Sequence, residues 1–167
     1  MESKTVILES RKIEQKITRM AYEIAEFNYD EPGVILIGIA DRGFQLAERI
    51  VTELRQCYDK PVQLGSLAMD KTNPVGTEYN VDISLAEMAG RSVIVVDDVL
   101  ESGRTLIYAS KFLLTANVKK LTTVVLVDRM HPKFPITADF VGMTLSTTLQ
   151  EHIHVDLTPG KEAVFLE

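Results

Sequence analysis

The sequence predicts an α/β fold: a mainly parallel, twisted sheet with helices on both faces and a small β-rich hood at the C-terminal end. Three observations support this prediction. Apolar runs of strand length alternate with amphipathic helical segments through residues 1–137, as expected of parallel strands joined by crossover helices. The remaining residues, 138–167, hold only short β-like segments. The length of 167 residues suits one domain, with 1–137 as its core and 138–167 as the hood.

The first half of the chain is expected to begin with a helix. Ile13, Ile17, Met20 and Ile24 are spaced by four, three and four residues, which marks one buried helical face. Ser10 fits the N-cap position of this helix. The elements predicted next are a strand at 34–38, a helix at 45–56 with Leu46, Ile50 and Leu54 facing inward, and a strand at 62–69.

The second half begins with residues 71–82, where Asn, Pro and Gly predict a mobile loop with a strand returning near Tyr79. His152 and His154 alternate along a later β-like segment, and we expect them on the hood surface rather than around a metal. The other elements predicted are strands at 93–98 and 121–128, a helix near 104–116 that contains Leu106, Leu113 and Leu114, and hood strands at 140–143, 152–157 and 163–166.

The composition is that of an ordinary globular protein, with 46% hydrophobic and 25% charged residues. A formal net charge of −6 provides no bulk attraction to nucleic acid or to an anionic membrane. The only cysteine, Cys57, excludes an intrachain disulfide and fits a reducing compartment. No apolar run is long enough to span a bilayer, and no leader-like pattern is present at the start. We therefore expect a cytoplasmic protein without membrane association.

Residues 93–105 read Val-Ile-Val-Val-Asp-Asp-Val-Leu-Glu-Ser-Gly-Arg-Thr and carry the strongest functional signal. The hydroxyl groups of Ser102 and Thr105, with backbone N–H groups at a helix N-terminus, can surround one phosphate. Gly103 allows the backbone to approach that phosphate closely. Asp97 and Asp98 can accept hydrogen bonds from sugar hydroxyls or hold Mg²⁺. This pattern predicts a receptor for a phosphorylated ribose.

The same stretch resembles the thirteen-residue phosphoribosyl-pyrophosphate (PRPP) signature of type I phosphoribosyltransferases. The apolar run, the acidic pair, the hydroxyl, the glycine and the closing threonine all match, with Ser102 standing where the family usually has threonine. The alternative is a buried strand whose two aspartates only cap the next helix. The complete spacing favours the PRPP signature.

A second segment at a predicted strand end runs from Gly38 to Gly43. It resembles the family's pyrophosphate loop, in which backbone amides and an arginine meet the leaving group. By this resemblance Ala40, Asp41 and Arg42 belong to the PRPP site, and Arg42 would stabilise charge on the departing pyrophosphate. The alternative is an ordinary turn in which Asp41 caps the helix and Arg42 is solvated.

A third segment narrows the resemblance to one branch of the family. Residues 128–136, Asp-Arg-Met-His-Pro-Lys-Phe-Pro-Ile, followed by 138–142, Ala-Asp-Phe-Val-Gly, are similar to the nucleobase region of PyrR, the pyrimidine-operon regulator and uracil phosphoribosyltransferase. The likeness covers most of the chain and is weakest at 66–82. It implies a base pocket lined by Asp128, Arg129, Val141 and Gly142. The alternative is that Asp128 and Arg129 form a structural salt bridge.

Three departures from the PyrR pattern affect the functional interpretation. Glu101 replaces an aromatic residue, and it either handles a base proton, as an aspartate does in purine relatives, or is exposed and inactive. The loop arginine is missing, so Lys71 either contacts pyrophosphate or is solvated. The basic residues of RNA-binding members are depleted, with Tyr22 and Met143 at two of those positions, so we predict no RNA binding.

The resemblance implies transfer of the 5-phosphoribosyl group from PRPP to a nucleobase, and the similarity to PyrR indicates uracil as that base. It also implies Mg²⁺ as the cofactor and a homodimer or larger homo-oligomer as the assembly. The alternatives are a purine phosphoribosyltransferase and a non-catalytic PRPP- or nucleotide-binding regulator. Asp97, Asp98, Arg42 and Glu101 are the candidate catalytic residues, and the first two would hold the metal. The implied PRPP site comprises Ala40, Asp41, Arg42, Gly43, Lys71, Asp97, Asp98, Val99, Leu100, Glu101, Ser102, Gly103, Arg104 and Thr105.

Overall fold

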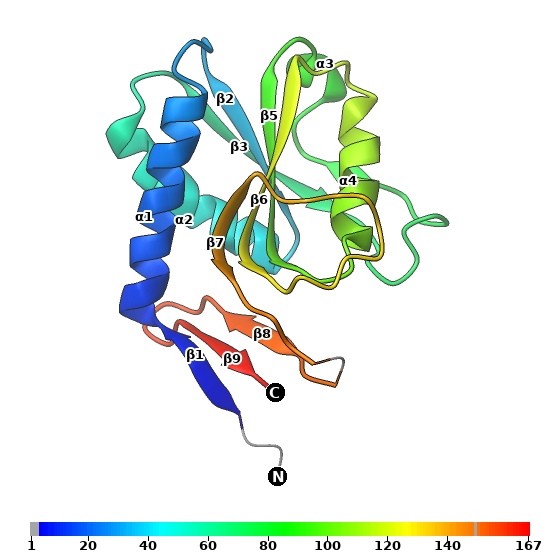
Figure 1. The fold of residues 1–167 in the computed structure, drawn as a ribbon. Helices are drawn as coiled ribbons and strands as arrows, with labels where there is room; N and C mark the ends of the chain where they lie inside the picture. The colour runs from blue at the N-terminus through cyan, green and yellow to red at the C-terminus, as the bar shows by residue number, and fades with distance from the viewer. Residues whose placement is uncertain (1–3, 149) are drawn as a thin grey trace.

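The computed structural model describes residues 4–148 and 150–167 and contains two sheets (Figure 1). The larger has the strand order β4-β3-β2-β5-β6-β7, and all its neighbouring strands are parallel except β4, which runs antiparallel to β3. Its strands are β2 (Val34–Ile39), β3 (Val62–Ala68), β4 (Asn80–Val81), β5 (Ser92–Leu100), β6 (Lys120–Asp128) and β7 (Phe140–Thr144). The predicted fold class is confirmed.

The smaller sheet is antiparallel, with the order β1-β9-β8, and it forms the hood. Its strands are β1 (Thr5–Glu9), β8 (Ile153–Asp156) and β9 (Ala163–Leu166). The predicted boundary at residue 138 was wrong in two respects. β7 pairs with β6 and therefore belongs to the main sheet, whereas β1, which the sequence analysis missed, belongs to the hood.

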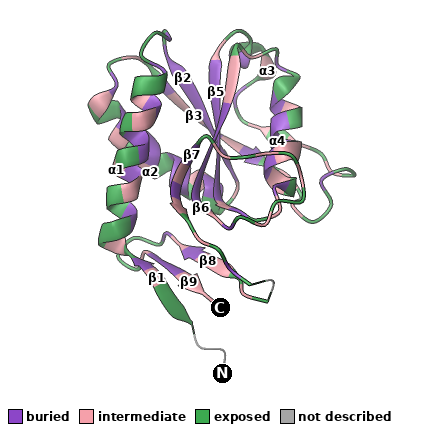
Figure 2. Ribbon diagram, in the orientation of Figure 1, coloured by how far each residue is buried: buried purple, intermediate pink, exposed green. Residues whose placement is uncertain are grey.

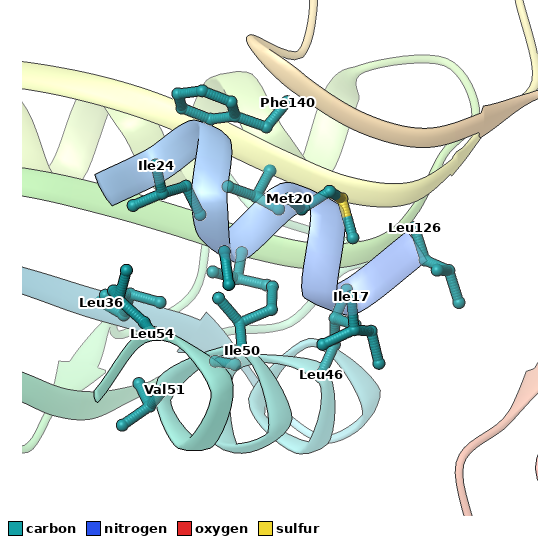
Figure 3. Packing of buried hydrophobic residues seen from close by; sticks show 14 of the residues in the cluster. Ile17, Met20, Ile24, Leu36, Leu46, Ile50, Val51, Leu54, Leu126 and Phe140 are labelled. Carbon is teal, nitrogen blue, oxygen red and sulfur yellow. The ribbon is translucent and has the colours of Figure 1, made fainter. Parts of the chain in front are cut away.

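Helices cover both faces of the main sheet, and the buried residues lie between them (Figures 1 and 2). Helices α1 and α2 pack together on one face, where Ile17, Met20 and Ile24 of α1 meet Leu46 and Ile50 of α2 (Figure 3). The other face is covered by α3 and α4. The helices are α1 (Ser10–Phe27), α2 (Arg42–Cys57), α3 (Leu85–Met88) and α4 (Arg104–Leu114).

One expectation about helices was wrong. Ser10 is the first helical residue of α1 rather than its N-cap, and its hydroxyl donates to Glu162 of the hood at 3.1 Å. Leu114, the last residue of α4, is 56% exposed, because it lies beside the buried helical face that holds Leu106 and Leu113. No helix in the described part of the chain has the length and apolarity needed to cross a membrane.

Candidate active site

A cleft of about 370 Å³ lies where β2, β3, β5 and β6 reach their carboxyl ends. Ligands bind at this edge in open α/β sheets because the connecting loops diverge there. The lining residues come from the end of β5, from the segments that follow the four strands, including the starts of α2 and α4, and from the start of β8 with the residue before it. They are Arg42, Lys71, Asp97, Asp98, Val99, Leu100, Glu101, Ser102, Gly103, Arg104, Thr105, Leu106, Arg129, His152 and Ile153.

Two buried carboxylates form the floor of this cleft. Strand β5 continues to Leu100, so Asp97 and Asp98 lie within the strand rather than after it, with only 3% and 7% of their surfaces exposed. Burial, and secondarily the neighbouring charge of Asp98, raises the pKa of Asp97 to about 7. Lys71 partly opposes this rise, because its Nζ lies 3.1 Å from Asp97 Oδ1. Arg42 lies 3.9 Å from Asp98 Oδ2.

The two carboxylates offer the hard oxygen ligands that Mg²⁺ prefers, so the residues present fit this cofactor. No group of three His, Cys, Asp or Glu side chains is clustered anywhere in the described residues. Two carboxylates alone do not complete an octahedral shell, and the remaining ligands would have to come from substrate oxygens and water.

The turn from Ser102 to Thr105 is shaped to leave backbone N–H groups accessible. Gly103 is the N-cap of α4, and its φ of +86° is a left-handed conformation that favours glycine. A Cβ atom at this position would lie 2.6 Å from Cγ2 of Ile136. No side chain caps the helix, and Ser102 Oγ accepts a hydrogen bond from the Arg104 amide at 3.2 Å. The first turn of α4 therefore points its positive end into the cleft.

The 40–43 turn brings only one of its four residues into the cleft lining, namely Arg42. The peptide bond between Ala40 and Asp41 is cis. Asp41 precedes α2, but its side chain makes no capping hydrogen bond, which removes the alternative of Asp41 as a side-chain cap. Gly43, the second residue of α2, lies directly against β5, where an added Cβ would lie 2.6 Å from the carbonyl oxygen of Val96. Gly43 thus allows the close approach that places Arg42 beside the acidic pair.

Lys71 belongs to the segment between β3 and β4, and its ion pair with Asp97 excludes the alternative of a merely solvated lysine. Asp70 supports the start of this segment by accepting hydrogen bonds from the Thr72 amide at 2.9 Å and hydroxyl at 2.7 Å. Farther along, Tyr79 stacks on Phe112 of α4 with ring centroids 5.0 Å apart. The segment is therefore anchored at both ends, with its one cation against the cleft floor.

Only one of the four residues predicted to line the base pocket belongs to the lining of this cleft. Arg129 lines the cleft, but Asp128, Val141 and Gly142 do not. Asp128 Oδ1 accepts a hydrogen bond from the Met130 amide at 2.9 Å, and so it stabilises the turn after β6. The carbonyl groups of Val141 and Gly142 accept hydrogen bonds from Arg19 of α1 at 2.9 and 2.7 Å. These three residues thus make contacts within the protein, and their part in a base pocket stays a prediction.

Arg129 pairs with Glu101 rather than with Asp128, which removes the alternative of a salt bridge between Asp128 and Arg129. Glu101 is half exposed and lines the cleft directly before the turn from Ser102 to Thr105. It is thus neither free in solvent nor buried.

His152 and Ile153 complete the wall on the hood side. His152 was expected on the hood surface, and its place in the cleft wall corrects that expectation. The alternation of residues along a strand does not reveal which face of the strand meets the cleft.

Comparison with known proteins identifies this architecture. The family described as the phosphoribosyl transferase domain matches residues 3–159. The chain belongs to the phosphoribosyltransferase family. Bifunctional protein PyrR of Ligilactobacillus salivarius (strain UCC118) is 35% identical over 175 residues, covering 96% of this chain and 97% of the relative. Bifunctional protein PyrR of Staphylococcus aureus (strain bovine RF122 / ET3-1) is 35% identical and covers 93% of each chain.

Solved structures of phosphoribosyltransferases share the fold. The hypoxanthine phosphoribosyltransferase of Trypanosoma cruzi has a TM-score of 0.80 at 19% identity, covering 97% of this chain and 95% of the other. A hypoxanthine-guanine phosphoribosyltransferase of Bacillus anthracis has a TM-score of 0.76 at 21% identity, covering 89% and 86%. The protein is thus a phosphoribosyltransferase of PyrR-like sequence, a pentosyl-transferring enzyme whose sheet topology matches these purine enzymes.

Proposed function

We propose that this phosphoribosyltransferase transfers the 5-phosphoribosyl group of PRPP to uracil, forming UMP and pyrophosphate. One observation carries the proposal: an uncapped helix N-terminus and a glycine turn face a cleft whose floor is a buried pair of carboxylates. Positive backbone dipoles beside two acids suit a phosphorylated sugar better than they suit either a simple anion or a metal alone. The resemblance to PyrR supports uracil as the base.

In this proposal each part of the cleft has one role. The 5′-phosphate binds the turn from Glu101 to Thr105, and the ribose hydroxyls bind Asp97 and Asp98. Arg42 and Lys71 pair with the two carboxylates in the absence of substrate. When PRPP binds, both cations leave the carboxylates and bind the pyrophosphate oxygens. When bound, Mg²⁺ would neutralise part of the pyrophosphate charge while being held by Asp97 and Asp98 together with substrate oxygens.

Catalysis in this cleft would rest on positioning and charge rather than on a nucleophilic side chain. The C–O bond to pyrophosphate breaks while a ring nitrogen of the base approaches the opposite face of the anomeric carbon. Positive charge develops on the sugar and negative charge on pyrophosphate. In this arrangement the buried carboxylates meet the positive charge on the sugar, and Arg42 and Lys71, once displaced from these carboxylates, meet the negative charge on pyrophosphate.

A purine base is the second candidate, and Glu101 is the observation that favours it. Its carboxylate lies in the cleft next to the phosphate turn and is held by Arg129. In that position it could accept a proton from a purine ring nitrogen. With uracil the proton on the reacting nitrogen would leave to solvent or to the departing pyrophosphate, and the same carboxylate could accept it.

A panel of bases tests both candidates. Purified protein with PRPP and Mg²⁺ is offered uracil, hypoxanthine, guanine, xanthine or orotate, and pyrophosphate release is measured. We expect release with uracil, and loss of release in the double variant Asp97→Asn plus Asp98→Asn. Release only with a purine, abolished in Glu101→Gln, would establish the second candidate. Absence of release with every base, or full activity of the double variant, would overturn the proposal. A cytoplasmic homodimer or larger homo-oligomer is part of the same proposal.

A further inference from the structure

Arg129 is a buried cation, and each of its three side-chain nitrogens donates to a protein atom. Only 4% of its surface is exposed, although it lines the cleft. Its Nε donates to Oγ1 of Thr147 at 2.6 Å, and Nη1 pairs with Glu101. Its Nη2 donates to the carbonyl oxygens of Thr148, at 2.9 Å, and of Glu151. Four of the five N–H groups are used in these bonds, which leaves one N–H of Nη1 for a ligand.

These partners belong to two parts of the protein that are far apart in sequence. Glu101 begins the phosphate turn, whereas Thr147, Thr148 and Glu151 belong to the connector, the segment between β7 and β8. The connector leads directly to His152 and Ile153 on the cleft wall. The guanidinium therefore ties the phosphate side of the cleft to the hood side.

A second side chain holds the same connector. Nε2 of His131 lies 2.5 Å from the carbonyl oxygen of Thr147, whose hydroxyl is bound by Arg129. Thr147 is itself buried, with 8% of its surface exposed. The connector is also closed internally, because Oε2 of Glu151 accepts a hydrogen bond from the Thr148 amide at 2.7 Å. Arg129 and His131 thus hold the hydroxyl group and the carbonyl group of Thr147.

We infer that Arg129 is a positioning residue for the base end of the cleft: it fixes Glu101 and the connector, and it does not itself bind the base. The inference rests on the proposed function, since it assumes that a nucleobase occupies this end. Arginine suits the role because its planar fork serves a carboxylate and two carbonyl groups at once, which the point charge of lysine cannot do. Removing the fork leaves several buried acceptors without a donor.

Measurements of ligand affinity can distinguish an effect at the base end of the cleft from an effect at the phosphate end. Calorimetry would measure the affinities of ribose 5-phosphate, UMP and IMP for wild type, Arg129→Met, Arg129→Lys and the control Arg55→Met, whose residue donates to the Val62 carbonyl away from the cleft. In Arg129→Met we expect the tighter nucleotide to weaken by about tenfold or more, the equivalent of one charge-assisted hydrogen bond, with ribose 5-phosphate changed less than about twofold. Arg129→Lys should recover part of the loss, and Arg55→Met should resemble wild type.

Amide hydrogen exchange supplies a readout that needs no ligand. In Arg129→Met, exchange at Thr147, Thr148 and Glu151 should accelerate, while the amides of β2 remain protected. If Arg129→Met fails to fold, Thr147→Val serves instead, since it removes only the Nε hydrogen bond and should weaken the nucleotide by about threefold. Unchanged exchange in the connector of a folded variant, or equal weakening of ribose 5-phosphate and nucleotide, would overturn the inference.

Failure of the proposed function would be recognisable by a different result. If wild type binds ribose 5-phosphate but gains no affinity from the base of either nucleotide, then the base site itself is absent. Faster connector exchange in Arg129→Met would in that case still establish that Arg129 fixes the connector, and only its assignment to a nucleobase would fall.

Discussion

The buried acid Asp97 should make the protein less stable than its amide variant at neutral and alkaline pH. Asp97→Asn keeps the shape of the side chain and an oxygen that can accept the Asp98 amide, which lies 3.0 Å from Oδ1 of Asp97. The variant removes only the cost of ionising a carboxyl group that is 3% exposed. Because the proposed chemistry requires the ionised carboxylate, the same variant should lose PRPP affinity and turnover.

The sign and size of this effect follow from the pKa of Asp97. Burial first and Asp98 second raise this pKa from 3.8 to about 7 in the folded protein. Between these two pH values the folded state retains a proton that the unfolded state has released, so the free energy of unfolding falls as pH rises through the window. One pKa unit corresponds to about 1.4 kcal/mol, so the full loss above pH 7 is on the order of 4 kcal/mol. This figure already includes the Lys71 ion pair, which lowers the pKa of Asp97 and so reduces the loss.

Urea denaturation of wild type and Asp97→Asn at pH 4, 5, 6, 7 and 8 measures the difference directly. We expect equal stability near pH 4 and an advantage of about 2 to 4 kcal/mol for the variant at pH 8. Asp156→Asn is the matched control with the opposite sign, because hydrogen bonds from Thr158 lower the pKa of Asp156 and its ionised form is favoured by folding. The reasoning would be refuted if Asp97→Asn were no more stable than wild type at pH 8. It would also be refuted if the variant's gain in free energy of unfolding were as large at pH 4 as at pH 8.

Three further predictions concern the phosphate turn, the metal and RNA. Gly103→Ala should destabilise the protein by about 1 to 3 kcal/mol and weaken PRPP at least tenfold, as measured by denaturation and calorimetry, because φ is +86° and Cβ would meet Ile136. EDTA should abolish pyrophosphate release and added Mg²⁺ should restore it, with activity in EDTA contradicting a metal role. A gel shift with a pyrimidine leader RNA should show no tight binding, because Arg19 is engaged by Glu23 and by main-chain carbonyls and Thr18 by Glu53.

The parts of the fold that the sequence predicted well are those set by local pattern. The stripe at Ile13, Ile17, Met20 and Ile24 is fully or almost fully buried, and it faces α2 and the sheet as its spacing indicates (Figure 3). The phosphate turn was equally predictable, since the order of apolar run, acids, hydroxyl and glycine is local too. Strand β1 was missed because its five residues pair only with β9, more than 150 positions away along the chain.

The base end of the cleft could not be predicted for a related reason. Asp128 and Arg129 are adjacent and oppositely charged, which suggested either an ion pair or a shared pocket. The structure instead uses Asp128 for the turn at Met130 and sends Arg129 to Glu101 and the connector. The contacts of Arg129 leave no signal in spacing, because its partners lie 18 to 28 residues away on either side. An arginine directly after a buried apolar strand was the available hint.

This division between local and distant contacts has a consequence for substrate choice. The proposed ribose and phosphate site is built by one continuous segment, from Asp97 to Thr105, whereas Arg42 and Lys71 come from two other segments. The proposed base end depends on Glu101, Arg129 and a connector that ends at His152, and these contacts can change while the acidic pair and the turn from Ser102 to Thr105 are kept. We therefore expect a carboxylate at position 101 to alter the base end while the phosphate end is kept. The base panel must be run on both the wild type and the Glu101→Gln variant. Only the two together distinguish a uracil enzyme in which Glu101 has no role from an enzyme that uses Glu101 to accept a purine base.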